Sequence, residues 1–174
     1  MTGARVLDLG CGSGGNLAHL TAIGADAVGV DISPVQLAKA HERWPHLDVR
    51  QDTAESFLAT APHRYAAVYS VFGAAWFTHP ADLLPLVRAR LQPGGVYAFS
   101  HNPPALMGCY GAQASQMEPL TKGEEPLYVR RWDYEPRTWV EIVERAGFTE
   151  VTAEVIPPPA GKRTGTLLVR GIRA

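Results

Sequence analysis

The stretch Arg5–Asp31, RVLDLGCGSGGNLAHLTAIGADAVGVD, decides the fold of this 174-residue chain. Its first five residues form a short apolar run typical of a buried strand, and the glycine-dense turn Gly10–Gly15 follows at once. Apolar residues then recur at helical spacing over Asn16–Ile23, and Ala27–Asp31 predicts a second strand. A strand, a tight turn, a helix and a second strand make a βαβ unit, whose crossover places the two strands parallel.

The same alternation continues along the chain. Ser33–Pro34 predicts a helix start, because serine caps helices and proline suits the first helical position. Asp82 is expected to cap a further helix, because Pro85 is tolerated only in a first turn. The remaining expected elements are strands over Leu47–Gln51, Tyr65–Phe72 and Val96–Ser100, a helix over 83–91, a helix from Pro136 to Gly147, and strands over Thr149–Ile156 and Thr166–Ile172.

The last two strands are joined by Pro157–Gly161, which is too short for a crossover helix. They should therefore be antiparallel. Residues 102–135 lose periodicity and gain Pro and Gly, which favours a loop with short helical pieces. We expect one α/β domain over residues 1–174, built as a doubly wound, mostly parallel sheet with an antiparallel edge.

Composition excludes several classes of function. Sixteen Lys and Arg against 17 Asp and Glu give a net charge of -1, whereas binding nucleic acid or a membrane surface unaided requires surplus positive charge. Two cysteines cannot build a multi-bridge framework, and no stretch has the apolar length of a membrane span. We therefore expect a soluble cytoplasmic protein with a small-molecule partner, without nucleic acid or membrane. A homodimer is one option that the residues leave open.

The glycine turn alone discriminates poorly between ligands, since its spacing also fits the dinucleotide fingerprint. Asp31 ends the second strand, where a carboxylate can accept both hydroxyls of a ribose in either kind of site. Asp8 would repel a pyrophosphate but attract an ammonium group, and Asp52 adds a further carboxylate. No Lys or Arg is suitably placed to neutralise a diphosphate. The crevice therefore favours a cationic ligand, with a nicotinamide-dependent oxidoreductase domain as the alternative.

Five segments together resemble the class I S-adenosylmethionine-dependent methyltransferases of small-molecule type. They are VLDLGCGSG at Val6–Gly14, VGVDIS at Val28–Ser33, QDTAE at Gln51–Glu55, LQPGGV at Leu91–Val96, and the late helix and turn over Trp139–Phe148. The resemblance implies a Rossmann-like sheet of seven strands in the order 3-2-1-4-5-7-6, with strand 7 antiparallel. It also implies an enzyme that transfers a methyl group to a small acceptor and leaves S-adenosylhomocysteine.

The resemblance assigns cofactor contacts to ten residues at the carboxyl ends of the first four strands. At the methionine end, Asp8 would meet the amino group, Ser70 and Val71 would line the site, and Gly10, Cys11 and Gly12 would allow the cofactor to approach the backbone closely. Asp31 would hold the ribose. Ile32 would lie against the adenine, and Asp52 and the Thr53 N–H would also meet the adenine. Structural alternatives are that Ile32 belongs to the core, that Cys11 only fills space, and that Asp52 caps a helix.

Methyl transfer from a sulfonium needs a general base only when the acceptor must lose a proton. His101 follows the fifth expected strand and His79 follows the fourth, so both are candidate catalytic bases. Either could instead be a surface or loop-capping residue. No group of His, Cys, Asp and Glu shows the spacing of metal ligands, so no metal is expected.

Residues 102–135 are expected to cover the acceptor, as an insertion between the fifth strand and the last helix. Its apolar and aromatic residues could enclose a flat molecule, although an excursion without a ligand is the alternative. The first strand leaves no room for the helices that usually precede it in this family, which suggests a truncated chain, a more open pocket or a lid from a partner. A non-catalytic S-adenosylmethionine-binding domain therefore remains an alternative. The apolar and aromatic residues within 102–135 that could enclose the acceptor are Met107, Tyr110, Met117, Tyr128, Trp132 and Tyr134.

Overall fold

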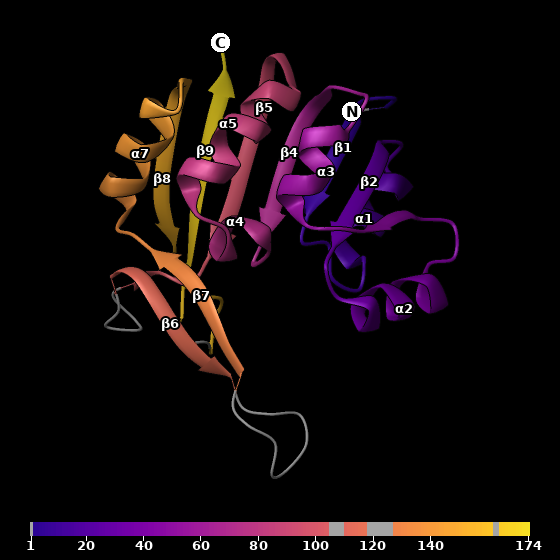
Figure 1. The fold of residues 1–174 in the computed structure, drawn as a ribbon, viewed down its shortest axis with the longest axis horizontal. Helices are drawn as coiled ribbons and strands as arrows, with labels where there is room; N and C mark the ends of the chain where they lie inside the picture. Colours follow the sequence, from indigo (N-terminus) through magenta and orange to yellow (C-terminus); the bar gives the residue numbers. More distant parts are fainter. Residues whose placement is uncertain (1, 105–109, 118–126, 162–163) are drawn as a thin grey trace.

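The computed structural model describes residues 2–104, 110–117, 127–161 and 164–174, which form a twisted sheet with helices packed against it (Figure 1). The strands are β1 (Arg5–Leu9), β2 (Asp26–Asp31), β3 (Asp48–Gln51), β4 (Tyr65–Val71), β5 (Leu91–His101), β6 (Gly111–Met117), β7 (Leu127–Asp133), β8 (Phe148–Ile156) and β9 (Thr166–Arg173). The helices are α1 (Gly15–Ala22), α2 (Pro34–Arg43), α3 (Ala54–Thr60), α4 (Ala74–Phe77), α5 (Pro80–Arg90) and α7 (Pro136–Arg145).

Seven of the strands form one sheet in the order β3-β2-β1-β4-β5-β9-β8. Strands β1 to β5 are parallel to one another, whereas β9 is antiparallel to both β5 and β8. With β8 and β9 counted as the sixth and seventh strands, the expected order and the expected antiparallel strand are both confirmed. The carboxyl ends of β1, β2 and β4 therefore meet at one edge of the sheet, where the strand order reverses.

The sheet buries apolar side chains on both faces, as a doubly wound fold requires. Leu7 and Leu9 of β1 point into the larger core, which also takes in side chains of α3, α5 and α7. Val6 lies on the opposite face and packs with α1 and with Trp44 at the end of α2. This alternation follows the two-residue period of a strand. Together the two cores fix the edge of the sheet at which the carboxyl ends of β1, β2 and β4 meet.

Helix α5 starts earlier than the sequence suggested. Its N-cap is His79, whose Nδ1 accepts a hydrogen bond from the Ala81 N–H at 3.1 Å, and Pro80 occupies the first helical position. Asp82 is therefore not the cap, and Pro85 lies inside the helix. The prediction was wrong because it required Pro85 to sit in the first turn, whereas α5 tolerates this proline in its interior.

Within residues 102–135, the described segments Gly111–Met117 and Leu127–Asp133 are strands, where a loop with short helical pieces was expected. Strands β6 and β7 pair as an antiparallel hairpin, in register from Gly111 opposite Asp133 to Met117 opposite Leu127. The β-branched and aromatic side chains of LYVRRWD favour a strand, a pattern that the surrounding Pro and Gly obscured. The hairpin extends from the end of the sheet at which β4 and β5 finish (Figure 1). Met107 lies outside the described residues. Among the described helices, none has both the length and the apolar character to cross a membrane.

Candidate functional site

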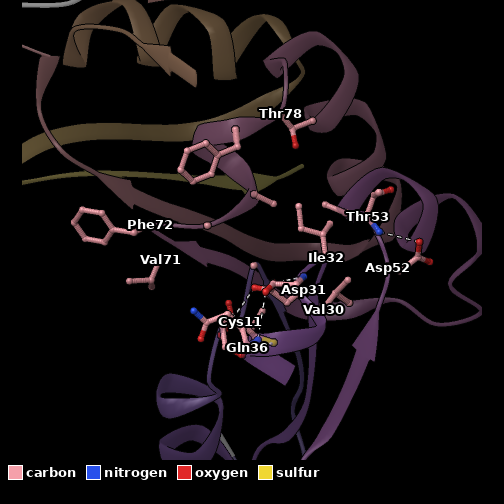
Figure 2. Close-up of a pocket in the computed structure, with 18 of the residues that line it drawn as sticks. Cys11, Val30, Asp31, Ile32, Gln36, Asp52, Thr53, Val71, Phe72 and Thr78 are labelled. Carbon is pink, nitrogen blue, oxygen red and sulfur yellow. Dashed lines mark hydrogen bonds between the residues drawn. The ribbon is translucent and has the colours of Figure 1, made fainter. Parts of the chain in front are cut away.

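A cavity of about 950 Å³ lies at the carboxyl ends of β1, β2 and β4, within the size range of small-molecule sites (Figure 2). Five segments line it: the glycine turn after β1, the end of β2 with the start of α2, the start of α3, the β4–α4 connection, and strand β7. The first three segments and Val71 carry nine of the ten predicted cofactor residues. The tenth, Ser70, does not line the cavity.

Asp31 is held rigidly by the glycine turn. Its Oδ2 accepts the Gly12 N–H at 2.8 Å, and its Oδ1 accepts the Ser33 N–H at 2.8 Å. Gly12 has a φ of 54°, and an added Cβ would meet nothing within 4 Å, so the backbone conformation rather than space requires glycine there. Each carboxylate oxygen keeps a free lone pair, so Asp31 can still accept hydrogen bonds from two hydroxyl groups.

Asp8 is a buried carboxylate with one oxygen that lacks a partner. Its side chain is 2% exposed, and its Oδ1 accepts no hydrogen bond from the described residues. The pKa of Asp8 is raised to about 7: burial raises it most, a hydrogen bond with the Tyr69 hydroxyl lowers it, and the neighbouring Asp31 adds a smaller rise. Because an unpaired buried polar atom is costly, this position favours a ligand that brings a hydrogen-bond donor or a positive charge.

Ile32, Asp52 and Thr53 form the side of the cavity beyond Asp31 (Figure 2). Ile32 is 68% exposed and so does not belong to the core. Asp52 Oδ1 accepts the Thr53 N–H at 2.8 Å, while the Thr53 hydroxyl caps α3 by accepting the Ser56 N–H at 3.1 Å. The Thr53 N–H is therefore engaged, and its predicted contact with an adenine ring requires the Asp52 carboxylate to turn away.

Cys11 and Ser70 are two buried residues at the cavity. Cys11 lines it but is only 8% exposed, and burial raises the pKa of its thiol to about 12, so the thiol stays protonated. Ser70 is fully buried and donates to the Leu9 carbonyl at 2.6 Å while accepting the Ala75 N–H at 3.1 Å. Ser70 thus joins the end of β1 to the start of α4.

The connection from β4 to α4 supplies further lining residues, of which Phe72 was not predicted from the sequence. Phe72 has a φ of 51°, a left-handed conformation that is strained for a bulky residue, and its N–H donates to the Ser100 carbonyl at 2.8 Å. Phe72 and Phe77 are each 42% exposed in the cavity wall. Gly73 lets the chain pass close to β1, since a Cβ there would lie 2.5 Å from the Leu9 carbonyl oxygen. The signal was the apolar run VFGAAWF, which continues past the end of the strand.

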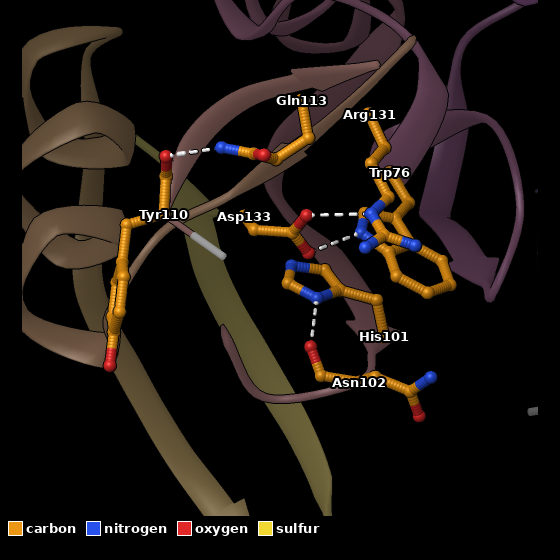
Figure 3. Close-up of polar contacts among 7 residues, drawn as sticks. All are labelled: Trp76, His101, Asn102, Tyr110, Gln113, Arg131 and Asp133. Atoms are coloured by element: carbon orange, nitrogen blue, oxygen red, sulfur yellow. Dashed lines mark hydrogen bonds and ion pairs between the residues drawn. The ribbon is translucent and has the colours of Figure 1, made fainter. Parts of the chain in front are cut away.

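Neither predicted histidine lines the cavity. His101 is fully buried, its Nδ1 lies 2.7 Å from the Asn102 carbonyl, and its ring stacks on Trp76 with centroids 5.3 Å apart (Figure 3). Burial lowers the pKa of His101, which favours the neutral ring. His79 caps α5 and meets the Trp132 ring edge-on. A catalytic role for either stays a prediction, and it needs movement of the surrounding side chains.

The base of the hairpin is tied to α4 by a buried polar cluster. Asp133 is fully buried and accepts hydrogen bonds from Trp76 Nε1 at 2.9 Å and from Arg131 Nε at 2.8 Å (Figure 3). The Arg131 guanidinium also lies 5.4 Å from the centre of the Trp76 ring. The cluster fixes β7 beside the cavity, where Val129 and Arg130 complete the lining. Among the residues that the structure describes, no three His, Cys, Asp or Glu side chains gather as metal ligands would.

Residues 6–95 match the model of a family described as a methyltransferase domain. A ubiquinone biosynthesis O-methyltransferase of Roseobacter denitrificans is 33% identical over 159 residues, which cover 84% of this chain and 63% of that protein. The chain spans about half the length of the curated relatives it matches, from 37% to 63%.

Solved structures share the fold over nearly the whole chain. An S-adenosylmethionine-dependent methyltransferase from Mesorhizobium loti superposes with a TM-score of 0.74 and 20% identity, covering 99% of this chain and 92% of its own. The glycopeptide N-methyltransferase MtfA, solved with S-adenosylmethionine, has a TM-score of 0.75 and 17% identity, covering 100% of this chain and 88% of its own.

Proposed function

Because this chain belongs to the methyltransferase domain family, we propose that it binds S-adenosylmethionine in the cavity and transfers its methyl group to a small-molecule acceptor. The observation that carries the proposal is Asp8, a buried carboxylate with an unpartnered oxygen in a cavity that three other acidic residues also line. Such a cavity attracts a nucleoside amino acid that carries positive charge and repels a diphosphate.

The residues present fit this cofactor. Asp8 would accept from its amino group, Asp31 from its ribose hydroxyls, and the exposed Ile32 would cover one face of its adenine. Asp52 would meet the adenine amino group once its carboxylate turns from the Thr53 N–H. Gly10, Cys11 and Gly12 would let the ligand approach the backbone, and Val71 would face its methionine end. S-adenosylmethionine, when bound, supplies a methyl group already activated by the sulfonium charge.

The main contribution of the chain is to orient the reactants. The new bond forms between the methyl carbon and the acceptor atom, the carbon–sulfur bond breaks with its electron pair passing to sulfur, and S-adenosylhomocysteine leaves. Holding the acceptor in line with that bond supplies up to about 7–11 kcal/mol of barrier lowering. The hairpin β6–β7 and the wall of Phe72 and Phe77 would cover the acceptor, so we assign residues 102–135 to acceptor binding.

The fate of the acceptor proton separates two versions of the proposal. His101 and His79 lie outside the cavity wall, which favours an acceptor that is already deprotonated or that loses its proton to water. The same observation supports the alternative of a non-catalytic S-adenosylmethionine-binding domain. The nicotinamide-dependent alternative has weaker support, because the cavity offers four acidic side chains around any diphosphate. Its described lining does also contain one basic side chain, Arg130, where the sequence had indicated none. The near-neutral charge and the buried free thiol of Cys11 are in keeping with a cytoplasmic protein.

The test is transfer of label. The protein is incubated with S-adenosylmethionine carrying a deuterated methyl group and with pooled small-molecule acceptors, and products are followed by mass spectrometry. We expect S-adenosylhomocysteine to form together with an acceptor that is heavier by one labelled methyl group, and the yield of both should fall in Asp31→Asn when the cofactor is limiting. Cofactor binding without any labelled product would establish the binding-domain alternative and refute the enzyme.

A further inference from the structure

We propose that the acceptor carries a carboxylate on a flat apolar body, and that Arg130 binds this carboxylate. The proposal rests on the proposed function and deepens it, because it names the substrate class of the same cavity. Three features of the described residues carry it: the charge of the cavity, the contacts of Arg130, and the apolar wall on the side away from Asp52.

The cavity separates its charges. Four of its lining residues are acidic, namely Asp8, Asp31, Asp52 and Glu55, and they lie at or just beyond the carboxyl ends of β1, β2 and β3. Among the described lining residues, Arg130 is the one basic side chain, and it comes from the hairpin. A basic side chain in a cavity whose other charged side chains are acidic provides a site for a second, negatively charged ligand beside a positively charged first one.

Arg130 has no structural task of its own. It is exposed, it forms no ion pair or side-chain hydrogen bond within the described part of the chain, and its cross-strand neighbour is Ala114. The next residue shows the contrast: Arg131 is buried and bound to Asp133. The guanidinium of Arg130 therefore keeps its planar set of donors available, which matches a carboxylate in two parallel hydrogen bonds.

An apolar wall lies on the same side of the cavity. Val71, Phe72 and Phe77 are 41–42% exposed there, and Val129 of β7 adds to them. Figure 2 shows Val71 and Phe72 on the side opposite Asp52 and Thr53. Phe72 stands in a strained left-handed conformation that keeps its ring in the cavity rather than in the core. A flat apolar ligand bound here would cover these side chains and bring its carboxylate within reach of β7.

The experiment compares two probes that differ only in charge, 2-naphthoate and 2-naphthamide, on protein saturated with S-adenosylhomocysteine. Dissociation constants are measured by ligand-observed NMR. We expect naphthoate to bind roughly five- to thirtyfold more tightly than naphthamide, as one charge-assisted contact allows. The preference should disappear in Arg130→Gln and persist in part in Arg130→Lys. Arg137→Gln is the matched control, because Arg137 is 93% exposed on α7, away from the cavity, and pairs only with Glu141.

Three results would overturn the proposal: equal binding of the two probes to the wild type, a preference that survives in Arg130→Gln, or a tenfold loss of S-adenosylhomocysteine affinity in that variant. The last would mean that Arg130 holds the carboxylate of the cofactor instead. If the wild type binds no S-adenosylhomocysteine, the proposed function fails. The probes are then compared on the protein alone, where loss of the naphthoate preference in Arg130→Gln still decides the assignment of Arg130.

Discussion

Asp8 links the electrostatics of the cavity to the stability of the fold. Burial raises its pKa from 3.8 to about 7, so the folded protein holds this proton more tightly than the unfolded chain does. Below pH 4 the Asp8 carboxyl is protonated in both the folded and the unfolded chain, so its titration does not change the free energy of unfolding. As the pH rises from about 4 to 7 the unfolded chain gains stability by ionising first, and above pH 7 the difference is constant.

We therefore predict that Asp8→Asn is more stable than the wild type at pH 8. The difference in the free energy of unfolding should grow between pH 4 and 7 and then level off, at about 1.4 kcal/mol for each unit of pKa shift. Urea unfolding at pH 4, 6 and 8 measures it. A difference that is the same at all three pH values would mean that Asp8 does not titrate as its burial implies.

Asp31 is the second residue on which the account depends. Replacing it with Asn removes the charge that we assign to the ribose, and we expect S-adenosylhomocysteine to bind more weakly by about 1.5–3 kcal/mol, the usual range for charged hydrogen bonds. Titration calorimetry gives the affinity. Asp48→Asn is the control, since Asp48 is exposed, pairs with Arg50 and does not line the cavity. An unchanged affinity in Asp31→Asn would show that this carboxylate does not hold the ribose.

Among the elements, the contact between α4 and β7 determines how the hairpin sits over the cavity. Trp76→Phe keeps an aromatic ring but removes the donor to the buried Asp133, at a cost of about 1.5–3 kcal/mol. We expect the amides of β6 and β7 to exchange faster in this variant, while those of β1 and β4 and the affinity for S-adenosylhomocysteine stay as in the wild type. Hydrogen exchange followed by mass spectrometry resolves these segments.

Trp44→Phe serves as the comparison, because the Trp44 indole N–H has no partner among the described residues and its loss breaks no hydrogen bond. Hairpin amides that exchange equally fast in the wild type and in Trp76→Phe would refute the tether. The same experiment tests whether β6–β7 is a separate unit from the sheet, since only its own amides should respond.

Elements were predictable where local pattern and tertiary environment agree. Most of the parallel strands are apolar runs bounded by Gly and Pro, so their places followed from the sequence, whereas their order was implied by the resemblance to a known family. The hairpin was missed because β7 buries Arg131 and Asp133 against each other, and a buried ion pair interrupts the apolar alternation that indicates a strand. The start of α5 was missed because a histidine cap leaves a weaker signal than an aspartate.

At the scale of the whole molecule, the cavity has two halves, and the lining residues of one could be predicted from the sequence far better than those of the other. The half that follows β1, β2 and β3 was predicted residue by residue, because its Gly and Asp residues stand at fixed positions after each strand. The other half is built from the β4–α4 connection and from β7, which meet only in the folded chain. Phe72 and Arg130 therefore required the structure, and Ser70 and His101 prove to be buried rather than exposed to a ligand.

The central claim is that this cavity accepts a nucleoside that carries an amino acid rather than a diphosphate. The most direct measurement is a pair of calorimetric titrations at pH 8, with S-adenosylhomocysteine and with NADH, followed by a competition between them. The account predicts saturable 1:1 binding of S-adenosylhomocysteine, no saturable heat from NADH, and no displacement of the first by the second. Saturable binding of NADH that competes with S-adenosylhomocysteine, or the absence of S-adenosylhomocysteine binding, would contradict it.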